Sequence, residues 1–297
     1  MRILLALALL AATGPGGLVA APPQRRRDGE GAVLGAPSLS VQPARVRPGD
    51  AFLVRARGLG APPAGTVAGR PLRFFPVPGG YEAVAALTLE TAPGTLAVRV
   101  TEATSAAPVR LSAELEVAEP HFPSKTLTVA PRFVEPSPEV RARVEEDRAA
   151  IARATDVPFV PPLFRGPFAW PRPPAFTGRY GDQRVYNGRL ASQHYGLDFR
   201  GAPGDPVRAA NDGVVVLRRD CEASGLTVIV HHGAGIFTSY FHLSRALVRE
   251  GERVERGALL GAVGSSGRAT GPHLHYSVRV GDLFVDPASL MRLDLGA

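Results

Sequence analysis

The stretch Gly271-Pro272-His273-Leu274-His275-Tyr276 places two imidazoles one residue apart in an otherwise apolar run. The short alternating segments around it favour a β-strand. On a strand, side chains at positions i and i+2 point to the same face. His273 and His275 are therefore predicted to project together toward a groove, whereas Leu274 and Tyr276 face the other way and Leu274 enters a core.

Two further segments carry histidines beside other polar side chains. In "QHYGLDF", His194 and Asp198 lie four residues apart around Gly196. That spacing would place both on one face of a helix, but Gly196 and the strand-like flanks favour a turn that runs into a strand. In "SYFHLS", Tyr240 and His242 are predicted to share one face of a hairpin strand.

These side chains are the types that a catalytic zinc site uses. Such a site keeps three protein ligands and one open position for water, and neutral histidines with a carboxylate are a common ligand set. His194, Asp198 and one histidine of the His-x-His pair would supply it and leave two histidines for acid–base work. A lone His-x-His is more often a satisfied polar pair, and three histidines are assigned no functional role: His121, His231 and His232.

Composition and charge narrow the class of protein. The chain has 297 residues, of which 45% are hydrophobic and 21% charged, as expected for a globular protein of about two domains. Its 33 glycines and 29 prolines favour strands and turns over long helices. The net charge of +7 attracts polyanions such as nucleic acid, anionic lipid or an acidic cell-wall polymer. No nucleic-acid-binding motif is present, so no nucleic-acid partner is predicted.

Residues 1–20 have the pattern of an export signal. Arg2 precedes the apolar run Ile3–Ala12, and small residues follow up to Ala20, where cleavage is predicted. The apolar run is too short for a stable membrane span. We therefore expect an exported protein, periplasmic or extracellular, that is not inserted in the membrane after cleavage. The single Cys221 excludes an internal disulfide and is predicted to be a small residue in a turn.

The rest of the chain is predicted to be mainly β. Residues 21–37, rich in Pro, Arg and Gly, are predicted to be a disordered linker. Short strands at regular spacing over residues 38–118 indicate an immunoglobulin-like β-sandwich. Residues 119–157 form a connector whose helix is predicted over Glu135–Ala154. Residues 158–297 form a second β domain, which the Pro-rich and aromatic segment Pro158–Pro174 crosses in extended form.

The second domain resembles the LytM/lysostaphin-type zinc metallopeptidases, the M23 peptidases. The resemblance lies in five segments that occur in the order seen in that family: "HYGLDF" (194–199), "GDPVRAANDGVVV" (204–216), "YFHLS" (240–244), "GERVERGALLGAVGSSGRATGPHLHYSV" (251–278) and "VDPASLM" (285–291). It implies a compact antiparallel β metallopeptidase domain with a narrow groove. It also implies hydrolysis of peptide bonds in bacterial peptidoglycan. The N-terminal sandwich resembles accessory domains found ahead of such peptidases.

The resemblance also implies a role for each histidine. His194, Asp198 and His275 would bind one Zn²⁺ per catalytic domain, and His242 and His273 would be the catalytic histidines. Which of the two is the base stays open. The family often has a tyrosine shortly before the first ligand, and Tyr186 is the nearby candidate. No His-Glu-x-x-His motif is present, so histidine rather than glutamate is expected to carry the proton.

The leading hypothesis is a zinc endopeptidase that cuts peptidoglycan cross-links or stem peptides. A non-catalytic wall-binding or amidase-activating module on the same fold is the alternative, and a structural β-protein with incidental metal binding is a third. The complete set of five site residues favours the first. The sequence leaves open the bond that is cut and whose wall is attacked. It also leaves open the oligomeric state and the role of residues 38–157, which could bind wall, bind a protein partner or block the groove.

Overall fold

The computed structural model describes residues 35–102, 108–127, 137–186 and 189–295. The predicted signal peptide and the linker up to residue 34 lie outside the described residues. Within the described part the protein is mainly β and its sheets are predominantly antiparallel, which confirms the predicted fold class. Neither helix in this part combines the length and the apolar character that crossing a bilayer requires.

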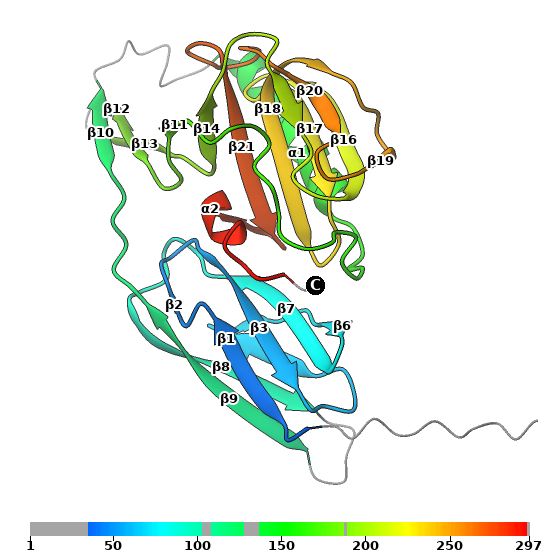
Figure 1. Ribbon diagram of the computed structural model, residues 1–297. Coiled ribbons are helices and arrows are strands. Elements are labelled where there is room, and N and C mark those ends of the chain that lie inside the picture. The colour runs from blue at the N-terminus through cyan, green and yellow to red at the C-terminus, as the bar shows by residue number, and fades with distance from the viewer. Residues whose placement is uncertain (1–34, 103–107, 128–136, 187–188, 296–297) are drawn as a thin grey trace, which may run out of the picture. The chain divides into compact units, whose positions relative to one another are not determined.

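Residues 38–102 and 109–117 form two facing sheets (Figure 1). The first has the spatial order β1 (Ser38–Gln42), β3 (Ala51–Arg57), β7 (Gly80–Ala86) and β6 (Phe75–Val77). The second has the order β2 (Arg45–Val46), β9 (Val109–Val117), β8 (Gly94–Glu102), β4 (Ala64–Val67) and β5 (Arg70–Pro71). Alternate residues of both sheets, including Phe52, Val98 and Leu115, are buried in one apolar core, as in a β-sandwich.

The C-terminal part is built on one large sheet, whose strands β21, β18, β17 and β16 lie side by side in Figure 1. Its main order is β11 (Phe176–Gly178), β14 (Leu197–Arg200), β21 (His273–Val280), β18 (Ile236–Ala246), β17 (Gly225–His231), β16 (Gly213–Cys221) and β19 (Arg253–Val254). Three further strands attach to it: β15 (Pro206–Arg208), β20 (Leu259–Val263) and β22 (Leu283–Val285). A small separate sheet contains β10 (Ser124–Leu127), β12 (Gln183–Tyr186) and β13 (Arg189–Gln193).

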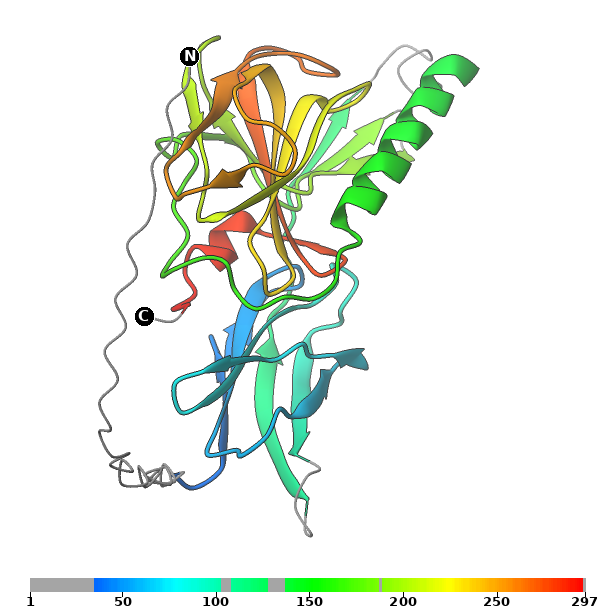
Figure 2. The same ribbon diagram turned by 90° about the vertical axis from the view of Figure 1, so that its right-hand side faces the viewer.

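Helix α1 (Pro138–Thr155) occupies the connector where a helix was predicted, and Figure 2 shows it along one side of the large sheet. It begins after Ser137, whose hydroxyl accepts a hydrogen bond from the Val140 N–H, with Pro138 in the first turn. Ile151 packs against a buried apolar cluster formed by Leu217, Ile229 and Phe237. The helix therefore covers strands β16, β17 and β18 rather than only joining two domains.

A second helix, α2 (Pro287–Leu290), lies in the segment "VDPASLM" and was not predicted as a helix. Asp286 caps it by accepting a hydrogen bond from the Ala288 N–H at 2.9 Å. The Ser289 hydroxyl accepts one from the Ala51 N–H of β3 at 2.8 Å. The end of the large-sheet domain is therefore hydrogen-bonded to the sandwich.

The segment from Pro158 to Pro174 contains no helix or strand and crosses the large sheet, as predicted. Its backbone pairs with loops of the sheet, for example through Leu163 N–H to the His232 carbonyl and Ala169 N–H to the Ala210 carbonyl, both at 2.8 Å. Phe168 is buried in the main apolar cluster. The segment therefore closes one face of the core.

His232, which was assigned no functional role, is fully buried. Its Nδ1 donates to the Asp212 carbonyl at 2.7 Å, and its Nε2 lies 2.8 Å from Thr238 Oγ1. Burial lowers the pKa of His232 from 6.5 to about 4 because the charged ring would lose its hydration. The ring is therefore neutral in the folded protein at neutral pH.

This burial predicts acid sensitivity. The pKa of His232 is 6.5 in the unfolded chain and about 4 in the folded protein, so between these pH values the unfolded chain binds a proton that the folded protein does not. Stability is thus complete above pH 6.5 and falls as the pH drops through this window, by up to about 3 kcal/mol from this residue. Urea unfolding at pH 7.5 and 4.5 will show a smaller loss for His232→Gln than for the unmodified protein. An equal decrease in unfolding free energy in both proteins would contradict the role given to His232 in acid sensitivity.

Candidate metal centre

Strands β14 and β21 bring the two sequence motifs together. They pair antiparallel with Asp198 opposite His275, so residues 77 positions apart become cross-strand neighbours. His194 precedes β14 in the predicted turn, which runs into the strand at Leu197. Leu274 and Tyr276 are completely buried, so the alternation predicted for the His-x-His strand is confirmed.

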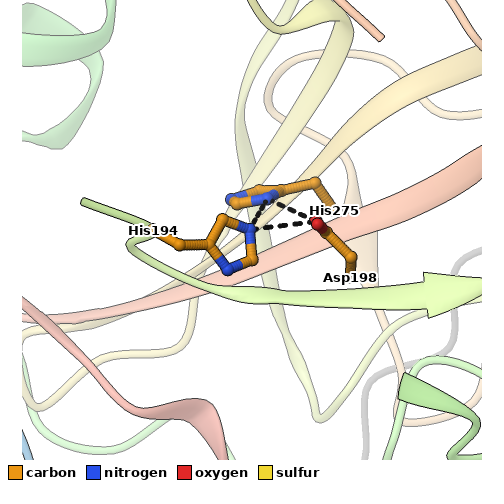
Figure 3. A group of neighbouring side chains, drawn as sticks. All are labelled: His194, Asp198 and His275. Atoms are coloured by element: carbon orange, nitrogen blue, oxygen red, sulfur yellow. Dashed lines mark hydrogen bonds and ion pairs between the residues drawn. The ribbon is translucent and has the colours of Figure 1, made fainter. Parts of the chain in front are cut away.

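Three side-chain atoms converge at this point, as Figure 3 shows. His194 Nε2 lies 3.0 Å from Asp198 Oδ1, and His275 Nδ1 lies 2.9 Å from the same oxygen. The two ring nitrogens are 2.9 Å apart. The predicted ligand set is therefore assembled in one place.

The chemistry of these atoms fits a bound cation. His194 Nδ1 lies 2.7 Å from the Arg179 carbonyl, which can only accept, so this nitrogen carries the proton and Nε2 of the neutral ring presents a lone pair. That lone pair faces a carboxylate oxygen and a second ring nitrogen at hydrogen-bonding distance. Two imidazole nitrogens and one carboxylate oxygen are a ligand set suited to a divalent transition metal.

The protonation states of the cluster agree with this. Burial alone would raise the pKa of Asp198, but the interactions with the His194 and His275 rings outweigh it and hold that pKa below its usual value. Burial lowers the pKa of His275, which keeps its ring neutral. An ionised carboxylate and a neutral imidazole are the forms that bind metal.

Gly178 makes the room that Asp198 occupies, a role that the sequence did not reveal. It ends β11, paired with Asp198, and a Cβ at this position would lie 2.5 Å from Asp198 Oδ2. Gly178→Ala must therefore displace the carboxylate. We expect metal affinity to fall by about 10–100-fold, as for the loss of groups that position a ligand, while the unfolding transition stays cooperative. Competition with a chromogenic chelator measures this, and unchanged affinity would show that the carboxylate adjusts freely.

His273 and His242 lie beside the three converging atoms. Nδ1 of His273 donates to the Gly271 carbonyl and Nδ1 of His242 to the Ser266 carbonyl, each at 2.8 Å. Their ring centroids are 4.8 Å apart, and His273 Nε2 lies 3.7 Å from Asp198 Oδ1. Because each Nδ1 donates to a carbonyl, Nε2 is the atom of each ring that is left to exchange protons.

The predicted shared face of Tyr240 and His242 is wrong. Leu226 of β17 pairs with Leu243 and Val228 with Tyr240, so β18 has one extra residue over this span. This β-bulge, with His242 at φ +60°, breaks the alternation. Tyr240 is fully buried beside Tyr276, whereas His242 turns toward His273.

Burial lowers the pKa of His242 to about 4, although the hydrogen bond to the Ser266 carbonyl opposes the shift. The ring is therefore neutral at pH 7 and able to accept a proton. A non-glycine residue at positive φ is uncommon and costs backbone energy, and such residues cluster at functional sites.

The five predicted residues line one groove of about 700 Å³. Sequence reasoning missed several other residues of its lining. Phe241 is the cross-strand neighbour of His275 and stacks on its ring, with the ring centroids 5.2 Å apart. Tyr195 of the "HYGLDF" segment is exposed there. Arg148 and Arg268 also line the groove. The side chain of Tyr186 lies outside the described part, so its role stays a prediction.

Comparison with known proteins explains this geometry. Residues 192–287 match the sequence profile of peptidase family M23. The part of the large-sheet domain that holds the site is similar to the M23 peptidases. This domain is 46% identical over 92 residues to the peptidoglycan DD-endopeptidase ShyA of Vibrio cholerae, a match that covers 31% of this chain and 21% of that protein. It is 42% identical over 97 residues to the DD-carboxypeptidase/endopeptidase Mpg of Neisseria meningitidis, covering 33% and 22%. The matched region is thus about a fifth of the length of these relatives.

The likeness to one solved structure extends beyond the part that matches the M23 profile. A Pseudomonas aeruginosa protein described as an M23 peptidase superimposes with a TM-score of 0.61 at 29% sequence identity, over 82% of this chain and 93% of that chain. Because residues 119–297 make up less than 82% of the chain, this overlap includes part of the N-terminal region.

Proposed function

We propose that this chain is a zinc-dependent endopeptidase that hydrolyses peptide bonds of bacterial peptidoglycan, in cross-links or stem peptides. The observation that carries the proposal is the convergence of three metal-binding atoms and two carbonyl-oriented imidazoles in one groove of a domain similar to the M23 peptidases. The substrate class is supported by relatives named as peptidoglycan endopeptidases.

His194, Asp198 and His275 would hold one Zn²⁺, because their atoms already converge in the required protonation states. When bound, zinc acts as a Lewis acid and lowers the pKa of a coordinated water toward about 7. The side chains that hold it are oriented by the backbone: the Arg179 carbonyl fixes the ring of His194, and pairing of β14 with β21 sets Asp198 against His275.

His242 and His273 would divide two tasks between them. One ring accepts the proton of the attacking water, and the other hydrogen-bonds the developing oxyanion or protonates the leaving amine. Both rings are held by a backbone carbonyl at Nδ1, so Nε2 is the atom at which protons are exchanged. His242, neutral at pH 7, is suited to accepting a proton.

The proposal extends to the organisation of the chain. Residues 1–20 would direct export to the periplasm or beyond, where peptidoglycan lies. Residues 38–118 would be an immunoglobulin-like accessory domain that binds wall or a protein partner, ahead of a connector (119–157) and a catalytic domain (158–297). Relatives that act on peptidoglycan support the exported location.

Incubation of the purified protein with defined muropeptides, followed by mass spectrometry, tests the proposal. We expect new peptide fragments that disappear with a chelator and return when zinc is added. Stoichiometric zinc without any new fragment would contradict it and favour a non-catalytic wall-binding or amidase-activating module. Elemental analysis of the same sample distinguishes this outcome from a preparation that lacks metal.

A further inference from the structure

Two arginines from separate elements line the groove of the metal centre. Arg148 belongs to α1, and Arg268 lies in the loop before β21. Helix α1 precedes residues 192–287, so Arg148 comes from outside the part that matches the M23 profile. The groove of this protein is therefore completed by a residue that the family match does not include.

The position of Arg148 is fixed by its neighbour. Asp147 is buried, and its carboxylate accepts hydrogen bonds from Arg219 Nε and from the Glu222 N–H, both at 2.7 Å. Charge-assisted bonds of this length to a buried carboxylate hold the middle of α1 against the edge of β16. The backbone of Arg148 is consequently held beside the groove, which the exposed side chain lines.

The loop that carries Arg268 is anchored just as firmly. The Arg268 N–H donates to the Ala223 carbonyl at 2.9 Å. Two residues earlier, the Ser266 hydroxyl donates to the Leu243 carbonyl at 2.8 Å and accepts from the Leu226 N–H at 2.9 Å. The base of the Arg268 side chain is therefore in a defined place on the rim.

The charge of the groove is unbalanced. Among the described residues that line it, Asp198 is the carboxylate, and the metal centre uses it. Arg148 has one exposed ion pair on its own helix, with Glu145 at 3.5 Å, which contributes little. Arg268 forms no ion pair with the described part of the chain, and its side chain is exposed. Two guanidinium groups are thus available to a ligand.

We propose that Arg148 and Arg268 make the groove selective for peptides that carry a carboxylate close to the scissile bond, a proposal that rests on the proposed peptidase function. A guanidinium donates two parallel N–H bonds to the two oxygens of a carboxylate. A carboxamide has only one acceptor oxygen and no charge, so it cannot form this pair. A positive rim also raises the local concentration of an anionic peptide. The substrate class is therefore an anionic rather than an amidated wall peptide.

A matched pair of substrates tests the selectivity. One is a cross-linked muropeptide dimer, and the other is the same dimer after carbodiimide and ammonia have converted its carboxylates to carboxamides. We expect amidation to lower kcat/KM by about tenfold or more in the unmodified protein, mainly through KM. Equal kcat/KM for the two substrates would overturn the proposal.

Three variants assign the effect. Arg148→Gln and Arg268→Gln should each lower kcat/KM for the acidic dimer by about two- to tenfold, the range for exposed charge pairs and charge-assisted bonds. Turnover of the amidated dimer should not change. Arg153→Gln, an equal loss of charge on the exposed face of the same helix, should behave like the unmodified protein. An effect of Arg153→Gln equal to that of Arg148→Gln would reduce the proposal to non-specific attraction and overturn it.

Equilibrium binding separates this proposal from the peptidase proposal. Fluorescence polarisation of the labelled acidic dimer with chelator-treated protein needs no catalysis. Weaker binding by Arg148→Gln and Arg268→Gln, together with no hydrolysis by the zinc-loaded protein, would refute the peptidase function and keep the carboxylate selectivity. Hydrolysis together with equal binding of both dimers would support the peptidase function and refute the carboxylate selectivity.

Discussion

Asp198→Asn will leave the protein folded but without stoichiometric metal, and hydrolysis will fall to background. The carboxylate contributes the negative charge of the three-atom cluster, and its Oδ1 lies 3.0 Å from His194 Nε2 and 2.9 Å from His275 Nδ1. Its loss should weaken metal binding by more than about 100-fold, because removing groups that merely position a ligand already costs about 10–100-fold. Elemental analysis and the muropeptide assay measure the two effects.

Asp220→Asn is the matched control, since Asp220 is an exposed carboxylate on β16 outside the groove. It should retain full metal content and activity. Asp198→Asn protein with one equivalent of tightly bound zinc would show that the metal is held elsewhere and would refute the centre described above.

His242→Asn should separate catalysis from metal binding. Asparagine tolerates the positive φ of this position better than alanine does, so the bulge can persist. The three ligand atoms are unaffected, and zinc should remain bound. Loss of a general acid–base group predicts a decrease in kcat of about 10²–10⁴-fold. Single-turnover kinetics on a muropeptide, with metal content determined in parallel, measures both.

His121→Asn, a change on an exposed histidine outside the groove, should leave kcat unchanged. If His242→Asn lost its zinc, the residue would have to be counted among the ligands. If it turned over within about threefold of the unmodified protein, His242 would not be the proton carrier.

Sequence reasoning succeeded where the geometry is local. The shared face of His273 and His275 follows from strand alternation alone, and the connector helix, predicted over Glu135–Ala154, is observed over Pro138–Thr155. The approach of His194 to Asp198 also depends on only a short turn. That His275 joins them was implied by the family resemblance, because pairing of distant strands is not encoded in spacing.

The failures have tertiary causes. The face of His242 depends on one extra residue in β18, which exists only relative to its partner β17. The sequence around Gly178 does not distinguish it from any other glycine in a strand, because its role depends on the Asp198 carboxylate that packs against it. Arg148 lies on a helix that was predicted, but its position at the groove depends on the hydrogen bond from Arg219 to Asp147, two residues 72 positions apart.

Because α1 covers apolar residues of the large sheet, it limits how many N-terminal residues can be removed from the protein. A fragment starting after Asp156 would lack Ile151 and Ala154, which pack against the apolar cluster of the large sheet. The cluster, formed by Leu217, Ile229 and Phe237, would then be exposed to solvent and would promote aggregation. It would also deprive Arg219 of its acidic partners on the helix. The smallest soluble fragment that contains the metal centre is therefore expected to begin no later than Ser137, 55 residues before the family match starts at residue 192.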